Sequence, residues 1–357
     1  MATAAELLDL DGVASRAEGV RFDITDTAGN VVSALHPITG GARIDNATGQ
    51  QIKRRLSGIR IHPDEYADID PIRHRIRPYW LLDVNGTVSE YPLGVFFVAD
   101  AQTKRTSVGT YLELSCVDGG QILGQQIPTS IGFDGGTLVT TAITTVAEAA
   151  GFFTTSVDTS TVTLGNALAW PAGKGGVTYA KILDDLCLLG GFHAAYFDND
   201  GLLTVRDATD LSTASAAYDF LDDGRIISGS VVESNTLLTA PNRFIVIDTT
   251  ATTGNTSYIY DIAESAPHSY ANRGFYVSRV VEAPGVGSTE QAAVVAETFY
   301  RQTPQAYETV VFASPPDPRL DTFDVINFRG VNYLEIEWSL VLTHGGPMTH
   351  KATRVYA

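Results

Sequence analysis

Cysteine is scarce in this 357-residue chain, which has only Cys116 and Cys187. Two thiols do not make a disulfide framework, and each of them sits in an apolar pattern. We therefore expect buried free thiols and folding in a reducing cytoplasm. The sequence also has no run of about 18 apolar residues, which excludes a membrane-spanning helix. Its N-terminus, MATAAELLDLDG, lacks a basic region before an apolar core, so we expect no secretory signal.

Catalytic and metal-binding signatures are missing as well. The sequence contains no G-x-S-x-G, H-E-x-x-H or C-x-x-C motif. Its seven histidines are scattered, and the nearest two, His344 and His350, are interpreted as a chance pair rather than a metal site. Carboxylates are so frequent that no two stand out as an acid–base couple. We therefore expect no enzyme, no cofactor, and no catalytic, cofactor-binding or metal-binding residue.

Two glycine-containing stretches match ligand loops only in part. Gly173-Lys174-Gly175 resembles a phosphate loop, but no Ser or Thr follows the lysine and the first glycine is misplaced. Asp198-Asn199-Asp200-Gly201 resembles a calcium loop. If Gly201 were the invariant glycine of such a loop, Tyr196 would have to be its first ligand, a role that tyrosine does not serve. A hairpin turn is the better interpretation of this second stretch.

Basic residues are few, and the formal net charge is −17. A surface this acidic does not bind nucleic acid as a whole, because phosphate contacts dominate that affinity. The one local reversal of sign is Arg73–Arg77. One interpretation of it is a nucleic-acid patch. The interpretation we favour is a strand whose alternate arginines share one face and are neutralised by the acidic loop His62–Pro71.

A chain of this length is too long for one ordinary core, so we expect two or three domains. Residues 1–16 are expected to form a helical or loosely ordered arm. Alternating segments then recur up to Asp118, among them Val20–Ile24, Gln51–Ile61, Tyr91–Asp100 and Tyr111–Asp118. Short strands at this spacing, with few helices, predict a sandwich or barrel over residues 17–118.

The stretch Gly176–Asp207 predicts a helix that leads into a hairpin. Thr178 can cap a helix that begins at Tyr179, and the apolar residues then fall at the spacing of one helical face. A pair of glycines ends this helix, and two short strands flank the hairpin turn already described. With a further helix over Leu138–Ala150, the pattern predicts an α+β domain over residues 119–215.

The remaining residues, 216–357, are β-rich again. Ile226–Val232 and Asn242–Ile247 are predicted strands, and further strands are expected toward the C-terminus. The best helix is Ser288–Thr303, whose first residue fits a capping box with Gln291. The segment is therefore predicted to be a second β domain with a small helical insertion. The sequence shows no internal repeat of a fixed short period.

Four stretches carry a resemblance through their order along the chain. A basic strand precedes a P-L-G-x-F strand, the central helix and hairpin read L-G-G-F and then F-D-N-D-G-L-L, and two further stretches follow. In order, they are Arg73–Pro78 with Tyr91–Phe96, Gly176–Asp207, Glu233–Val246, and Pro316–Ile326 with Gly345–Met348. In this order they resemble the tail-tip hub proteins of long-tailed bacteriophages, in particular minor tail proteins of phages of actinobacteria.

The resemblance implies a mainly β fold with α+β insertions. It implies an N-terminal arm (1–16), a first antiparallel β-barrel hub domain (17–118), an α+β domain (119–215) and a second β-barrel hub domain with a small helical insertion (216–357). It also implies a homotrimer whose six similar barrels imitate six-fold symmetry. Such a baseplate hub joins the six-fold tail tube to a three-fold tip.

The partners implied by the resemblance are the distal tail protein, the tape-measure protein and tail fibre or spike proteins. The protein would be a structural part of the virion at the tail tip, assembled in the host cytoplasm. DNA would pass through its lumen during ejection without specific binding, because acidic side chains repel phosphate. One alternative is a host-surface or carbohydrate-binding tail module. Another is a cell-wall hydrolase, which the missing acid–base signature disfavours.

Overall fold

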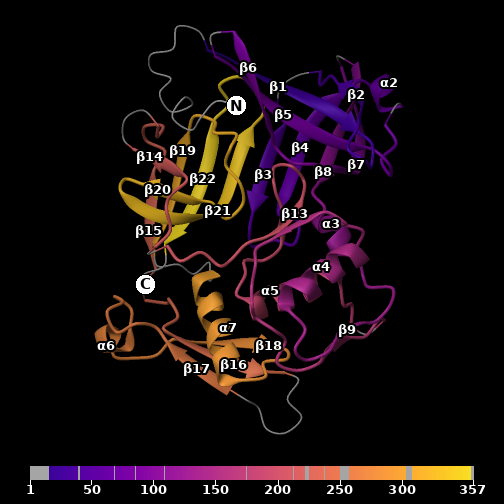
Figure 1. The fold of residues 1–357 in the computed structure, drawn as a ribbon. Coiled ribbons are helices and arrows are strands. Elements are labelled where there is room, and N and C mark those ends of the chain that lie inside the picture. The colour runs from indigo at the N-terminus through magenta and orange to yellow at the C-terminus, as the bar shows by residue number, and fades with distance from the viewer. Residues whose placement is uncertain are drawn as a thin grey trace.

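The computed structural model describes residues 16–38, 41–67, 69–84, 86–107, 109–173, 175–211, 213–221, 225–236, 238–249, 257–302 and 308–354 (Figure 1). The predicted N-terminal arm, 1–16, lies outside these residues except for its last position. Within the described residues no helix is long and apolar enough to cross a membrane. Both cysteines are buried free thiols, as predicted.

Strands dominate the chain. The first eight are β1 (Arg16–Thr25), β2 (Val31–Leu35), β3 (Arg43–Ala47), β4 (Arg54–Ile61), β5 (Arg75–Val84), β6 (Thr87–Pro92), β7 (Phe97–Thr106) and β8 (Gly109–Val117). The middle of the chain adds β9 (Ile131–Phe133), β10 (Thr155–Val157), β11 (Leu168–Trp170), β12 (Tyr196–Phe197), β13 (Leu203–Val205) and β14 (Tyr218–Phe220). The last are β15 (Val232–Asn235), β16 (Arg243–Asp248), β17 (Ser257–Asp261), β18 (Ser278–Ala283), β19 (Glu308–Ser314), β20 (Val325–Phe328), β21 (Val331–Val341) and β22 (Met348–Arg354).

The helices are short and lie mostly in the middle of the chain. They are α2 (Pro63–Tyr66), α3 (Gly120–Leu123), α4 (Val139–Ala149), α5 (Tyr179–Gly190), α6 (Tyr270–Arg273) and α7 (Thr289–Gln302). The three longest match the three predicted from sequence. The Lys181 amide donates to Thr178 Oγ1 over 3.2 Å at the start of α5, and Gly191 ends that helix with φ of 81°. The Gln291 amide donates to Ser288 Oγ in the same way at α7.

One large, mostly antiparallel sheet joins the N-terminal and C-terminal parts of the chain. Its main path runs β15-β19-β22-β21-β3-β4-β8-β7, with β20 and β14 attached beside β21. The predicted pair of separate barrels is therefore not seen, and the described strands form no closed barrel. The physical reason is that β3 pairs antiparallel with β21, so strands of both predicted barrels share one hydrogen-bonded sheet. A second sheet, β2-β1-β5-β6, packs over the N-terminal half.

The main path of this sheet is a tandem repeat of one topology. From its free end, the N-terminal half reads β7-β8-β4-β3, and the C-terminal half continues β21-β22-β19-β15. If the four strands of each half are numbered in chain order, their order across the sheet is third, fourth, second and first in both halves. Within each half, every pairing is antiparallel. We call these halves unit 1 and unit 2. Both share one apolar core, in which Trp80 and Phe96 lie in the same cluster as Phe312 and Trp338.

A second apolar core lies below the large sheet (Figure 1). Helices α4 and α5 contribute most of its N-terminal side. Helix α7 and the small sheet β17-β16-β18 contribute the rest, so residues of the chain around 140–205 and 240–300 bury their apolar faces together. The helical insertion predicted in the last segment therefore packs on the predicted α+β segment. The division into domains stays a prediction.

Two predicted strands differ from the structure at glycines. The segment Tyr91–Asp100 was expected to be one strand, but the chain breaks between β6 and β7, where Gly94 has φ of 119°. Ile226–Val232 was also expected to be a strand. Instead it turns at Gly229, with φ of 78°, and the strand β15 begins only at Val232. Only glycine adopts these backbone angles readily, so neither position is part of a strand, although β-branched residues lie nearby.

Candidate functional site

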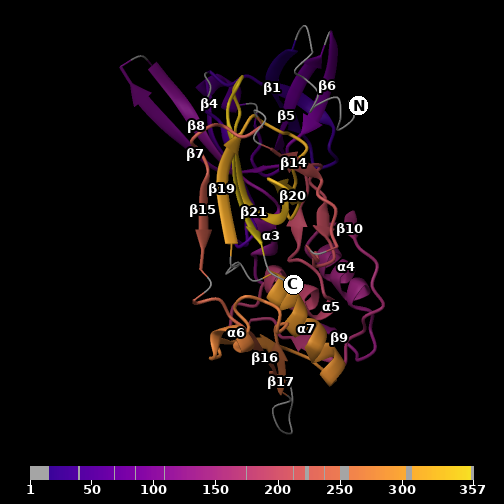
Figure 2. The same cartoon turned by 90° about the vertical axis from the view of Figure 1, so that its left-hand side faces the viewer.

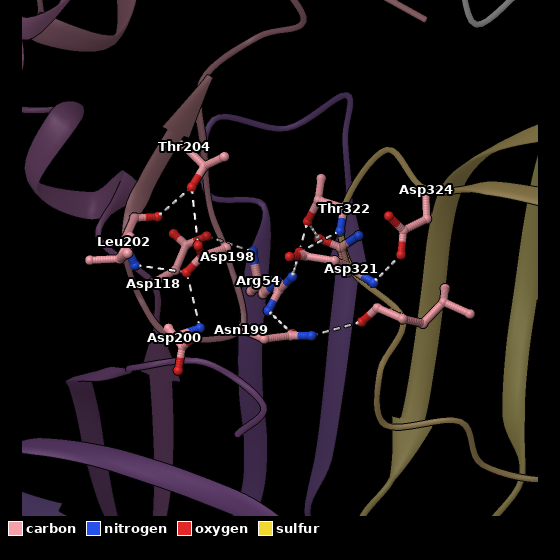
Figure 3. A network of polar contacts seen from close by, with 12 residues as sticks. Arg54, Asp118, Asp198, Asn199, Asp200, Leu202, Thr204, Asp321, Thr322 and Asp324 are labelled. Atoms are coloured by element: carbon pink, nitrogen blue, oxygen red, sulfur yellow. Dashed lines mark hydrogen bonds and ion pairs between the residues drawn. The ribbon is translucent and has the colours of Figure 1, made fainter. Parts of the chain in front are cut away.

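One highly connected polar group in the interior is the guanidinium of Arg54 on β4, a side chain that is 1% exposed. Its Nη1 donates to Asn199 Oδ1, 2.6 Å away in the turn between β12 and β13. Its Nη2 donates to Asp321 Oδ1 and, over 3.2 Å, to Thr322 Oγ1 in the loop before β20. Figure 3 shows the three chain segments meeting at this group. We call this set of contacts the Arg54 junction.

Neighbouring groups extend the junction on both sides. On one side, Asp118 at the end of β8 accepts from the Arg54 amide over 2.8 Å and from the Gly120 amide over 2.9 Å. Burial raises the pKa of Asp118, and these two amide donors oppose the rise. On the other side, Asn199 Nδ2 donates to the Leu320 carbonyl over 3.1 Å. The network therefore fixes unit 1, the hairpin and unit 2 relative to one another.

A second arginine faces the acidic side of the junction. Arg206, which directly follows β13 of the hairpin, lies 3.8 Å from Asp321 and 3.6 Å from Asp324. Two arginines thus face two aspartates. Burial raises the pKa of Asp324 to about 6, although the Asp321 amide donates to it. These ion pairs join chain segments that lie far apart in the sequence, so the arrangement holds the chain together.

Backbone strain marks the same place. Phe323, between the two junction aspartates, has φ of 62°, which a bulky side chain seldom adopts. Its ring stacks on His193 with centroids 4.2 Å apart and meets Tyr196 edge-on at 5.6 Å. These contacts hold the strained residue against the α+β segment. The pKa of His193 is lowered to about 3 by burial, so this ring is neutral and stacks as an uncharged group.

The hairpin turn that completes the junction is the one predicted at Asp198–Gly201. Asp198 Oδ1 accepts from the amides of Asp200 and Leu202, and its Oδ2 accepts from the Thr204 hydroxyl. The carboxylate is thus used by its own turn, and the hairpin β12–β13 is confirmed. In the described part of the chain, no group of His, Cys, Asp or Glu could hold a metal ion. Of the phosphate-like loop, Lys174 lies outside the described residues.

The basic run is neutralised in two ways. Arg77 Nη2 donates to Asp200 Oδ1 over 2.9 Å, and Arg73 lies 3.8 Å from Asp70 of the preceding acidic loop. Arg75 is half-buried, donates to the carbonyls of residues 72 and 74, and lies 3.9 Å from the centre of the Phe97 ring. Arg75 and Arg77 share one face of β5, as predicted, whereas Arg73 precedes the strand.

One arrangement that sequence reasoning missed has the geometry of a catalytic triad. Ser314 Oγ lies 2.7 Å from His350 Nε2, and His350 Nδ1 lies 2.6 Å from Glu335 Oε1. The three residues come from β19, β22 and β21, and no spacing in the sequence links them. His350 was interpreted as half of a chance histidine pair, but its ring lies within the apolar core.

Burial makes this triad structural. The three residues are at most 1% exposed, so no substrate reaches the serine. The Ser314 hydroxyl donates to the Pro315 carbonyl, so its oxygen accepts from His350 Nε2. In a neutral imidazole Nδ1 then accepts, and Glu335 must donate. Burial raises the pKa of Glu335 and lowers that of His350 to about 3, in agreement with this neutral chain of hydrogen bonds.

Comparison with known proteins identifies the fold. No protein-family model and no curated protein sequence matches the chain. Three solved tail proteins match it over nearly their whole length. The 43 kDa tail protein of prophage MuSo2 from Shewanella oneidensis has a TM-score of 0.59 at 12% identity, over 95% of this chain and 98% of that one.

The other two give similar values. A tail protein from Neisseria meningitidis has a TM-score of 0.58 at 12% identity, over 94% of this chain and 97% of its own. The prophage tail protein gp18 from Listeria monocytogenes has a TM-score of 0.60 at 11% identity, over 94% and 95%. The chain therefore has the fold of these tail proteins.

Proposed function

We propose that this chain is a structural protein of a phage virion, the hub at the tip of the tail. The observation that carries the proposal is the tandem repeat within one sheet, in a fold shared over nearly the whole chain with three tail proteins, two of them from prophages. Three copies with two units each would present six similar units in a ring. Such a ring matches a six-fold tail tube on one side and a three-fold tip on the other.

The hub is proposed to contact the distal tail protein above, the end of the tape-measure protein inside, and fibre or spike proteins below. Its work is mechanical, not enzymatic. The hydrogen-bonded chain of Ser314, His350 and Glu335 agrees with this assignment. It has the geometry of a catalytic triad, but its three residues are buried, so no substrate can reach the serine. The Arg54 junction suits it as well, since it fixes both units and the hairpin between them.

DNA ejected from the virion is proposed to pass through the centre of the ring. The net charge of −17 per chain supports this role, because a lumen lined by carboxylates repels phosphate and lets DNA pass without binding. A ring structure with a net positive lumen, or with Arg75 and Arg77 facing it, would contradict the proposal.

Negative-stain electron microscopy of the purified chain tests the hub. We expect three-fold rings with a central hole wide enough for a DNA duplex. If the chain alone is monomeric, the distal tail protein is added, and the rings are expected on that partner. A closed two-fold dimer without a hole, or monomers in both preparations, would rule out the hub.

A surface-binding module is the second candidate, and one patch of aromatic residues favours it. Tyr270 and Tyr276 stack with ring centroids 4.4 Å apart, and they are 50% and 41% exposed. Arg243 lies 3.5 Å from the Tyr276 ring centre, and Phe275 beside it is also exposed. Exposed aromatic rings can stack on sugar rings, so a glycan array with the Tyr270→Ala variant as control tests this role.

A further inference from the structure

The two units within one chain already show how a unit joins its neighbour. Counted along the sheet from β7 to β15, β3 is the last strand of unit 1, and it pairs antiparallel with β21, the first strand of unit 2. In this joint Asn46 lies opposite Trp338, and Ile44 lies opposite Leu340. The joint is a continuous sheet, and each unit contributes one edge strand to it.

The same two kinds of strand are left open at the far ends of the sheet. Strand β7 is the first strand of unit 1, and β15 is the last strand of unit 2. Among the described residues no strand pairs with the outer edge of either. All four residues of β15 are exposed, and Figure 2 shows the hairpin of β7 and β8 projecting beyond the rest of the sheet. In Figure 1 the two strands lie at opposite sides of the molecule.

We infer that β15 of one copy pairs antiparallel with β7 of the next copy and repeats between chains the joint that β3 and β21 form within the chain. The inference rests on the proposed hub, because it makes the sheet edges the contact that closes the ring. The two edges differ, so the contact is head-to-tail, the kind that closes into rings. It also covers edge backbone groups that would otherwise invite uncontrolled aggregation.

The register of this contact follows from the repeat. Each first strand has a one-residue bulge, which lies between Val98 and Asp100 in β7 and between Glu335 and Glu337 in β21. Superposing the bulges makes Val98 the equivalent of Glu335. It also makes Ala101, three residues on, the equivalent of Trp338.

The last strands align through their own partners. In unit 1, Ile44 lies opposite Leu56, which continues to Cys116 and then to Val98. In unit 2, Glu233 lies opposite Val310, which continues to Ala352 and then to Glu335. The two rows end at Val98 and Glu335, the same two residues that the superposed bulges make equivalent. The two central residues of each row are buried. Ile44 is therefore equivalent to Glu233.

Two residues further along, Asn46 is equivalent to Asn235. Since Asn46 lies opposite Trp338 within the chain, Asn235 lies opposite Ala101 of the next copy. Antiparallel pairing then sets three more pairs across the contact. They are Ser234 with Gln102, Glu233 with Thr103, and Val232 with Lys104.

The chemistry of these strands agrees with the derived register. Glu233, which accepts from Arg329 Nη1 over 3.1 Å within its own chain, shares a face with Arg105 of the next copy, two residues beyond its direct partner, and opposite charges on such diagonals attract. The exposed Val232 lies against the aliphatic stem of Lys104, which can cover it. Slipping the register by one residue would turn all these side chains to opposite faces and remove both contacts.

Lysine on an open edge strand can also prevent pairing with another strand, so Lys104 could either cover Val232 or block the contact.

Cysteine substitutions in the full-length chain distinguish these two roles. The native thiols are buried and do not interfere. We would combine Ser234→Cys with Gln102→Cys in one chain, and Glu233→Cys with Thr103→Cys in another. One of these directly opposed pairs has the close spacing of non-hydrogen-bonded positions, which suits a disulfide.

After mild oxidation, at least one double variant is expected to give covalent trimers on a non-reducing gel. Each single variant alone should stay unlinked, because a head-to-tail contact never brings a residue next to its own copy. Ser234→Cys with Ala101→Cys is the matched control. Its two side chains point to opposite faces of the sheet, so we expect at least tenfold fewer links than in the best opposed pair.

The outcomes separate this contact from the hub itself. Three-fold rings in the microscope without links in either opposed pair, or with equal links in the Ala101 control, would overturn the edge pairing and leave the hub intact. Links that build open ladders beyond the trimer would support the pairing and overturn the trimeric ring. Monomers without links, also after addition of the distal tail protein, would overturn both.

Discussion

Replacing Arg54 by methionine tests whether the buried junction holds the two units together. Methionine keeps much of the volume of the side chain and removes its charge and all its donors. The Asp321 carboxylate then loses its close charged partner and keeps the Thr322 amide, 2.6 Å away, and Arg206, 3.8 Å away. Asn199 Oδ1 and Thr322 Oγ1 lose a donor at the same time.

The expected cost follows from burial. Removing one partner of a buried ion pair costs about 3–5 kcal/mol, because the remaining charge is left without compensation. Arg206 is partly exposed and farther away, so it offsets only a small part of this. We therefore expect Arg54→Met to lower the free energy of unfolding by about 3–5 kcal/mol. Adding Asp321→Asn should restore part of the loss, because the double variant buries no isolated carboxylate.

Urea unfolding followed by circular dichroism measures these free energies. The matched control is Arg43→Met on the neighbouring strand β3, whose side chain is 52% exposed and pairs with Asp45 within its own strand. An exposed pair of this kind is worth about 0–1 kcal/mol. The reasoning would be refuted if Arg54→Met lost no more free energy of unfolding than the control. It would also be refuted if the double variant lost more free energy of unfolding than the two single variants together.

Three further predictions concern other parts of the chain. Burial raises the pKa of Asp324 to about 6, so the folded state holds a proton that the unfolded state has released. The resulting stability is complete below about pH 4 and lost as the pH rises through 6, by up to about 3 kcal/mol, and Asp324→Asn should flatten that part of the urea-unfolding profile. An added Cβ at Gly201, with φ of 81°, would lie 2.5 Å from a valine side chain, whereas Gly229, with φ of 78°, faces open space. Gly201→Ala should therefore cost about 1–3 kcal/mol more than Gly229→Ala in thermal unfolding, and equal losses would contradict the packing. Burial raises the pKa of both cysteine thiols to about 12, so neither should react with iodoacetamide until urea unfolds the chain, and labelling of the folded protein would show them accessible.

Local features of the fold could be predicted from the sequence. The caps at Thr178 and Ser288, and the turn at Asp198–Gly201, depend on residues within a few positions of one another. Such short-range signals keep their meaning in any tertiary context. The failures at Gly94 and Gly229 have the opposite cause, since strand-forming neighbours do not reveal which backbone angle a glycine adopts.

Long-range pairing was beyond the same reasoning. The Arg54 junction joins residues that are 145 and 267 positions apart, and nothing in their spacing predicts the contact. The repeat was also hidden, because the two units carry different insertions. Strands β5 and β6 interrupt unit 1, whereas the small sheet and α7 interrupt unit 2. Their strands match in pairing and burial but not in residue identity.

Because β3 pairs with β21, the ribosome makes one strand of this pair long before the other. Strand β21 leaves the ribosome about 290 residues after β3. At roughly 5–20 residues per second, the edge of β3 waits about 15–60 s for its own partner. During that interval it can pair with β21 of a finished copy nearby. Swapped assemblies, in which unit 1 of one chain completes its sheet with unit 2 of another, are therefore the expected by-product when many copies are made at once.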